Sequence, residues 1–175
     1  MKLLIAGVML TALAAAPAWA ALKPGDAAPT FKAQASMGGK VFAFDEKAAL
    51  KKGPLVLYFY PAAFTPGCTL EAHAFADATG DFAKLHATVI GVSRDDIEQL
   101  NKFSVSECRS KFAVAADADK SIMKSYDSVL AARPELSNRT SYVIAPNGKI
   151  VMAYSDMKPD QHVANSLAAV KALKK

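Results

Sequence analysis

The feature that most constrains this chain is a short apolar run that ends in a proline. Residues 55–60 read Leu-Val-Leu-Tyr-Phe-Tyr, which is too short for a helix and lacks the alternation of a half-exposed strand. Such a run is typical of the central strand of a sheet that is covered on both faces. Pro61 ends the run. We therefore expect a layered α/β domain built around this strand.

A cysteine follows this strand at the predicted start of a helix. Thr65 can cap the helix, and Pro66 can take its first position, where a missing N–H costs nothing. Cys68 then falls in the first turn. The unpaired N–H groups and the positive end of the helix dipole favour a thiolate over a thiol there. The sequence therefore predicts a reactive cysteine, which a purely structural role would not need.

The first twenty residues have the pattern of a secretory signal. Lys2 supplies the positive start, residues 3–16 are apolar, and Ala18-Trp19-Ala20 forms a small-x-small cleavage site. We expect a signal peptide over residues 1–20, cleavage after Ala20, a single domain over residues 21–175, and a periplasmic location. The apolar run is too short to span a bilayer and no second one follows, so no membrane partner is expected.

Charge and histidine placement argue against two other classes of function. The formal net charge is +5, but the basic residues are scattered and form no stripe with interleaved aromatics, so no nucleic-acid partner is expected. His73, His86 and His162 lack the spacing of metal ligands and are expected at the surface or on helix faces. The sequence thus predicts neither a metal site nor a cofactor.

Strand and helix patterns alternate along the rest of the chain. Their order predicts a mixed sheet flanked by helices, parallel in the middle and antiparallel at the end. This is a thioredoxin-like α/β fold with an N-terminal β-hairpin extension, whose turn is Gly38-Gly39. The predicted strands are 30–34, 40–44, 55–60, 88–93, 112–115, 140–145 and 150–154. The predicted helices are a turn within 45–52, then 66–85, 95–110, 121–126 and 160–173.

On the helix that carries Cys68, apolar residues recur at helical spacing. Those expected to face inward are Leu70, Ala74, Ala78, Phe82 and Leu85. Glu71 is placed on the exposed face by the same periodicity, although its position near the helix start also allows it to pair with Arg139.

The spacing Pro61-x-x-x-Thr65-x-x-Cys68 after a buried strand resembles the active-site motif of the peroxiredoxins. Further segments are similar to the bacterioferritin-comigratory, or Q-type, branch, and the resemblance covers roughly residues 24–173. They are Tyr58 to Pro61, Phe64 to Thr69, Glu71-Ala72, Gly91 to Ser93 and Arg139 to Ile144. The resemblance implies an exported antioxidant thiol peroxidase that converts hydrogen peroxide or an organic hydroperoxide into water or an alcohol.

Peroxide reduction needs donors that hold both oxygens while charge moves along the S–O–O line. The candidates are the Thr65 hydroxyl, the backbone N–H groups around Cys68 and the Arg139 guanidinium. Arg139 beside the sulfur would also favour the thiolate, and its planar fork suits two acceptors at once. The resemblance implies that Pro61 packs over the sulfur and keeps water from competing.

Cys108 is the candidate resolving residue. Many Q-type proteins carry a resolving cysteine at the position where this chain has His73, but another pattern of the branch places it in the following helix, near whose predicted end Cys108 lies. The resemblance then implies an intrachain Cys68–Cys108 disulfide as the catalytic intermediate, a thioredoxin-like dithiol reductant and a monomer. The alternative that Cys108 is a buried thiol without a role in the reaction stays open.

A second class of function is also open. The chain could be a non-enzymatic thioredoxin-fold binding protein, or a copper-delivery protein, whose two cysteines form a structural disulfide or a metal pair. Only the enzyme requires Thr65 and Arg139. These two residues favour the enzyme.

Overall fold

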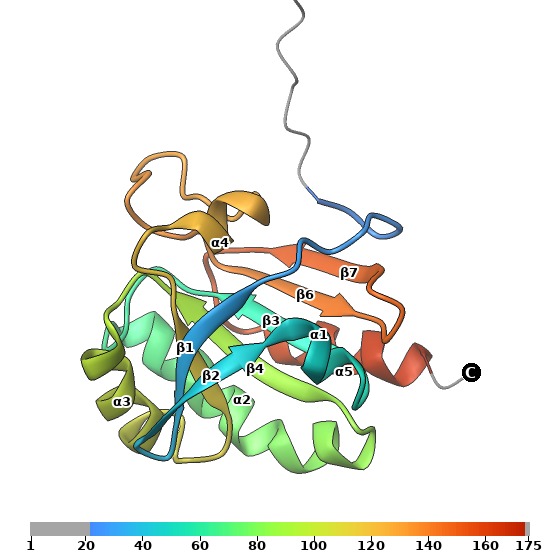
Figure 1. Ribbon diagram of the computed structural model, residues 1–175, viewed down its shortest axis with the longest axis horizontal. Coiled ribbons are helices and arrows are strands. Elements are labelled where there is room, and N and C mark those ends of the chain that lie inside the picture. Colours follow the sequence, from blue (N-terminus) through green and yellow to red (C-terminus); the bar gives the residue numbers. More distant parts are fainter. Residues whose placement is uncertain (1–21, 174–175) are drawn as a thin grey trace, which may run out of the picture.

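The computed structural model describes residues 22–173, and the predicted signal peptide and its cleavage site lie outside them. A seven-stranded sheet forms the centre, in the order β2-β1-β5-β4-β3-β6-β7 (Figure 1). The strands are β1 (Lys32–Met37), β2 (Lys40–Asp45), β3 (Leu55–Phe59), β4 (Thr88–Ser93), β5 (Ala113–Ala116), β6 (Thr140–Ile144) and β7 (Ile150–Ser155). The helices are α1 (Glu46–Leu50), α2 (Pro66–Lys84), α3 (Ile97–Ser106), α4 (Ser121–Ser125) and α5 (His162–Ala172).

The strand directions confirm the thioredoxin-like fold. Strands β3, β4 and β5 run parallel, whereas β6 and β7 are antiparallel to their neighbours. The β1–β2 hairpin adds to the other edge through an antiparallel pair with β5. Its turn uses Gly38 and Gly39 at φ +57° and +79°, a region that glycine enters without steric cost.

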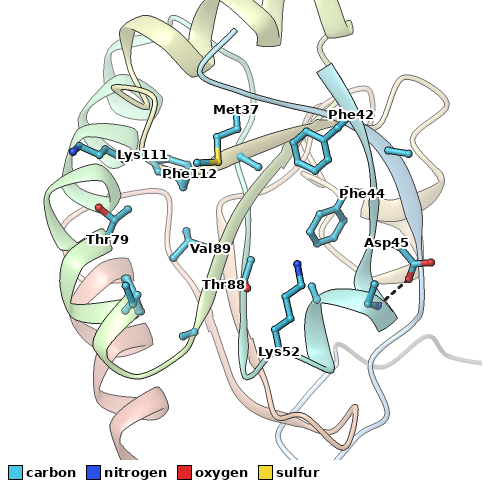
Figure 2. Close-up of a pocket in the computed structure, with 17 residues that line it drawn as sticks. Met37, Phe42, Phe44, Asp45, Lys52, Thr79, Thr88, Val89, Lys111 and Phe112 are labelled. Carbon is cyan, nitrogen blue, oxygen red and sulfur yellow. Dashed lines mark hydrogen bonds between the residues drawn. The ribbon is translucent and has the colours of Figure 1, made fainter. Parts of the chain in front are cut away.

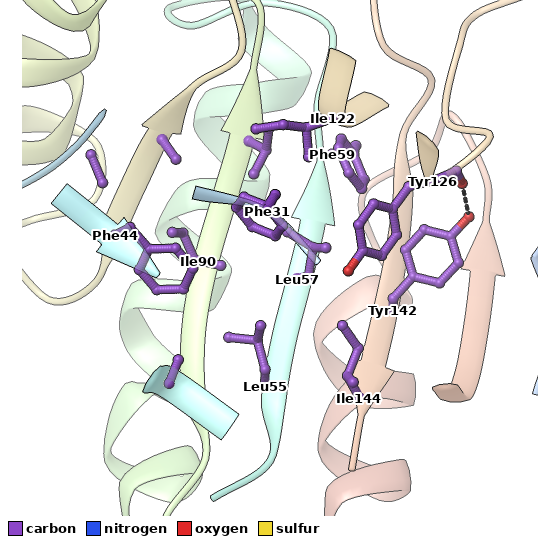
Figure 3. Packing of buried hydrophobic residues seen from close by; sticks show 14 of the residues in the cluster. Phe31, Phe44, Leu55, Leu57, Phe59, Ile90, Ile122, Tyr126, Tyr142 and Ile144 are labelled. Carbon is purple, nitrogen blue, oxygen red and sulfur yellow. Dashed lines mark hydrogen bonds between the residues drawn. The ribbon is translucent and has the colours of Figure 1, made fainter. Parts of the chain in front are cut away.

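Two apolar clusters cover the two faces of the sheet. One lies under α1 and α4 and includes alternate residues of β3, among them Leu55, Leu57 and Phe59 (Figure 3). The Tyr142 hydroxyl closes that cluster by donating to the Tyr126 carbonyl at 2.6 Å (Figure 3). The other cluster lies under α2, α3 and α5 and contains both cysteines. The strand β3 is buried along its whole length, as its unbroken apolar run predicts.

The inward face of α2 differs from the predicted one. Leu70 is 61% exposed and Ala74 is also exposed, whereas Glu71, predicted to be exposed, is fully buried. The buried residues of the helix are Cys68, Glu71, Ala72, Phe75, Ala76 and Phe82. The many alanines of this helix leave its apolar stripe ambiguous. Glu71 is buried because it pairs with the buried guanidinium of Arg139.

Helix α3 is shorter than predicted. Asp96 caps it by accepting from the Gln99 N–H at 2.7 Å, and the helix ends at Ser106. Cys108 therefore lies in the turn that follows the helix. Arg109 and Ser110 in this turn take left-handed backbone conformations at φ +49° and +58°, which a helix cannot contain. The predicted helix to residue 110 is wrong at this end.

Gly91 on β4 makes room for a buried ring. A Cβ built there would lie 2.7 Å from Cζ of Tyr58, which is closer than side chains tolerate. We expect Gly91→Ala to lower the free energy of unfolding by about 1–3 kcal/mol, as overpacking of a core does. The matched control is Gly80→Ala on α2, whose Cβ would meet nothing within 4 Å, and which should raise stability by about 0.5–1 kcal/mol. Urea unfolding midpoints measure both, and equal shifts would contradict this packing account.

Candidate active site

The loop between β3 and α2 delivers Cys68 to the first turn of α2, as predicted. Its N-terminal half is fixed by Asp95, whose Oδ2 accepts from the Ala63 N–H at 2.7 Å and from the Ser93 hydroxyl at 2.8 Å. Pro66 occupies the start of the helix. The Cys68 side chain is only 2% exposed, so its sulfur lies under the protein surface at a helix N-terminus.

Thr65 is the N-cap residue of α2, but its side chain does not cap the helix. The hydroxyl donates instead to the Ala62 carbonyl at 3.0 Å, while the Thr65 carbonyl accepts from the Thr69 N–H. The predicted side-chain cap is therefore wrong, and the helix start relies on Pro66. Thr65 is exposed and Pro61 is half-buried, both in the loop that leads to Cys68.

Sheet register brings Arg139 to the same place. Thr140 pairs with Phe59, so the residue before β6 lies beside the carboxyl end of β3, where the loop to Cys68 begins. Arg139 Nη2 lies 3.4 Å from Cys68 Sγ, and Nη1 forms a buried ion pair with Glu71. Its Nε donates to the Met157 carbonyl at 3.0 Å. All three guanidinium nitrogens thus have acceptors, which an arginine that is 3% exposed requires.

The carboxyl of Glu71 lies deep in this arrangement. Burial raises its pKa to about 8, and the opposing effect of Arg139 only partly offsets the cost of burying the charge. One oxygen, Oε2, meets Arg139, whereas Oε1 has no hydrogen-bond partner. The site therefore places one cation among two groups that can carry negative charge, the Cys68 sulfur and the Glu71 carboxyl.

Cys108 has a different environment. It is fully buried in the apolar cluster, and this burial raises the pKa of its thiol well above the usual range, with a smaller contribution from Glu107. Two contacts attach its turn to α2. His73 Nε2 lies 3.0 Å from Glu107 Oε2, and Arg109 Nη1 lies 2.6 Å from Asp77 Oδ1. Both cysteines are free, so the structure describes the dithiol form.

The histidines are placed differently from one another. His86 is exposed and His73 is half-buried, but His162, the first residue of α5, is completely buried, so a surface position is wrong for it. Residues 22–173 contain no group of three or more histidine, cysteine, aspartate or glutamate side chains that could hold a metal ion. Within the same range, no helix is long and apolar enough to cross a bilayer.

A cavity of about 460 Å³ lies away from Cys68, between the β1–β2 hairpin and the end of α2 (Figure 2). Met37, Phe42, Phe44 and Phe112 give it an apolar wall (Figure 2). None of the predicted site residues lines it. This cavity is therefore separate from the Cys68 and Arg139 site.

The structure adds three groups to the site that the sequence does not predict there. The Met157 carbonyl accepts from Arg139, His162 Nδ1 lies 3.6 Å from Glu71 Oε1, and the Ser141 hydroxyl lies 2.8 Å from the same Nδ1. The residue types alone gave no signal for them, because a backbone acceptor has no sequence pattern and a lone serine or histidine on an element is common.

Comparison with known proteins shows the family and the fold of this chain. Residues 24–153 match the AhpC/TSA family. Peroxiredoxin Q of the chloroplast of Oryza sativa subsp. japonica is 32% identical over 150 residues, which cover 85% of this chain and 67% of that protein. The crystal structure of peroxidoxin BcpB from Mycobacterium tuberculosis superposes with a TM-score of 0.79 at 29% identity, covering 88% of this chain and 99% of that one. The structure of peroxiredoxin Q from Xanthomonas campestris superposes with a TM-score of 0.71 at 29% identity, covering 81% of this chain and 91% of that one.

A thioredoxin-like domain that holds a buried cysteine at a helix start beside an arginine defines a thiol-based enzyme class. Within that class, the chain belongs to the AhpC/TSA family and is a peroxiredoxin similar to the Q-type and bacterioferritin-comigratory proteins.

Arg139→Met should slow alkylation of Cys68 by iodoacetamide at pH 7 by about ten-fold or more, because a unit charge about 4 Å from an anion is worth several kcal/mol at intermediate dielectric. Mass mapping of the alkylated peptide measures the rate. Arg133→Met is the matched control, since Arg133 is exposed and pairs with exposed Glu135. Equal rates for Cys68 in the two variants would mean that Arg139 does not activate the sulfur.

Proposed function

We propose that this peroxiredoxin reduces hydrogen peroxide and organic hydroperoxides with Cys68 as the peroxidatic residue, as part of antioxidant defence. The observation that supports this most directly is the contact between Arg139 Nη2 and Cys68 Sγ in a buried site. The bacterioferritin comigratory protein of Xanthomonas campestris, 28% identical to this chain at a TM-score of 0.71, has alkyl peroxide reduction activity. That relative supports the inclusion of organic hydroperoxides.

In the first step, the Cys68 thiolate attacks one peroxide oxygen. The S–O bond forms as the O–O bond breaks, and the leaving hydroxide or alkoxide takes up a proton to become water or an alcohol. Cys68 becomes a sulfenic acid. Arg139 and the backbone N–H groups of the first turn are the donors for the two oxygens, together with the Thr65 hydroxyl once it leaves the Ala62 carbonyl. Pro61 limits the access of water to the sulfur.

In the second step, the Cys108 sulfur attacks the sulfenic sulfur, so that an S–S bond forms and water leaves. A thioredoxin-like dithiol protein then reduces the disulfide and is itself oxidised. Because Cys108 is fully buried and its burial favours the neutral thiol, its turn must open before this attack. Both cysteines belong to one chain, so this route needs no second subunit and is compatible with a monomer.

The proposed subcellular location rests on the N-terminal sequence. Residues 1–20 have the pattern of a cleaved secretory signal, with cleavage after Ala20, which would leave residues 21–175 as one exported domain. We therefore place the enzyme in the periplasm. The direct reductant would then be an exported thioredoxin-like protein, because cytoplasmic thioredoxin is absent from that compartment.

Free-thiol counts after one equivalent of hydrogen peroxide test this function. The reduced protein should lose both thiols rapidly, and Cys68→Ser should consume no peroxide above the buffer rate. Cys108→Ser should lose its one thiol at the normal rate, leave a sulfenic acid open to overoxidation, and stop disulfide-dependent turnover.

Three other results would point elsewhere. Peroxide consumption by Cys68→Ser would reject Cys68 as the nucleophile. Normal turnover of Cys108→Ser with a dithiol protein would replace this route with a one-cysteine mechanism. Loss of both thiols in the wild type at the slow rate of free cysteine would favour a binding or copper-delivery protein with a structural disulfide.

Disulfide formation should loosen two segments, because the Cα atoms of a disulfide lie within about 7 Å of each other and the two cysteines start on separate elements. Amide hydrogen exchange should show lower protection over residues 65–70 and 104–111 in the disulfide form than in the dithiol form. Residues 55–60 should be unchanged, since they are buried in the sheet centre. Identical exchange in both forms would show that no local opening accompanies the bond.

A further inference from the structure

His162 begins α5 and is fully buried next to the active site. Its Nε2 lies 2.8 Å from the Asp156 carbonyl, and its Nδ1 lies 2.8 Å from the Ser141 hydroxyl. The same Nδ1 is 3.6 Å from Glu71 Oε1. The edge of the ring also meets Tyr154, with a centroid distance of 4.8 Å. A buried imidazole with partners on both nitrogens is held in one orientation.

The partners also define its tautomer. A carbonyl oxygen can only accept, so Nε2 carries the proton and donates to Asp156. In the neutral ring, Nδ1 then accepts from the Ser141 hydroxyl. Burial lowers the pKa of His162, which keeps the ring neutral at neutral pH. The charged groups that face it are Glu71 from α2, Arg139 before β6 and Asp156 after β7.

The two oxygen acceptors that hold Arg139 are each linked to this histidine. Arg139 Nε donates to the carbonyl of Met157, whose neighbour Asp156 has its own carbonyl bound by His162. Arg139 Nη1 binds Glu71, whose other carboxylate oxygen faces His162 Nδ1. The remaining nitrogen, Nη2, points to the sulfur. The direction of Nη2 is therefore set by Glu71, which faces His162, and by the Met157 carbonyl, which follows directly after the carbonyl that His162 binds.

We propose that His162 is a positioning residue for the peroxidatic step: it fixes the Asp156–Met157 segment and the Glu71 carboxyl, and through them aims Arg139 at Cys68. It touches neither the sulfur nor the peroxide. Its effect on the rate passes through the guanidinium alone. The inference rests on the proposed role of Cys68 and adds a residue on α5 to the machinery.

The experiment compares second-order rate constants for the oxidation of Cys68 by hydrogen peroxide, measured by rapid mixing and thiol quenching. His162→Ala should lower the constant about ten-fold, because small misplacement of a catalytic group is costly. His162→Gln should recover most of the rate, since its amide can still donate toward the Asp156 carbonyl. Val170→Ala is the matched control: it is a fully buried residue of the same helix that makes none of these hydrogen bonds.

A double-mutant cycle separates positioning from mere support of the fold. In an Arg139→Met background, His162→Ala should change the rate by less than about two-fold, because residues that act through one group are not additive. Thermal unfolding of each variant reports its stability. Val170→Ala should lower the melting temperature but leave the rate constant near that of the wild type.

Two results would overturn the proposal. One is an equal rate loss in Val170→Ala and His162→Ala at similar melting temperatures. The other is a full ten-fold effect of His162→Ala in the Arg139→Met background. These failures are distinct from a failure of the proposed function, which would appear as a slow wild-type enzyme or an active Cys68→Ser variant.

Discussion

The site depends on one buried cation. Arg139 is almost fully removed from water, so its charge is stable only if anionic or carbonyl acceptors meet it inside the protein. Glu71 and the Met157 carbonyl meet two of its nitrogens, and the third faces the Cys68 sulfur. One group thus pairs with a buried carboxyl and also lies against the sulfur of a buried cysteine. The pairing of β3 with β6 makes this possible, because it brings residues far apart in sequence to one edge of the sheet.

The two cysteines lie in the same apolar cluster but differ in their surroundings. Cys68 has a helix N-terminus and a guanidinium beside it, whereas Cys108 lies in the apolar cluster with Glu107 and the buried Tyr58 and Tyr60 nearby. Positive charge favours a thiolate, and burial among apolar groups favours a thiol. The proposed order of reaction, with Cys68 first and Cys108 second, rests on this difference in surroundings.

Much of the fold could be predicted from the sequence, because its strongest signals are local. The run at residues 55–60 identified the central strand, β4 was located at Thr88–Ser93, and Gly38-Gly39 marked the hairpin. The errors have tertiary causes. Helical periodicity places Glu71 on the exposed face of α2, which is wrong, but its predicted pairing with Arg139 is confirmed and explains its burial. The burial of His162 is not predicted either, since its partners come from β6 and from the segment after β7.

The segment around Cys68 and the turn that contains Cys108 are held in place by interactions of different strength. Around Cys68, Arg139 and Glu71 form a buried pair, and removing one partner of such a pair typically costs about 3–5 kcal/mol. The Cys108 turn is attached to α2 by Arg109–Asp77, whose side chains are 45% and 71% exposed, and by the half-buried His73–Glu107 contact. Exposed pairs contribute about 0.2–1 kcal/mol each. The turn also contains two residues in left-handed conformations. The contacts that attach the Cys108 turn to α2 are therefore weaker than the Arg139–Glu71 pair, and the proposed opening of this turn can leave that pair in place.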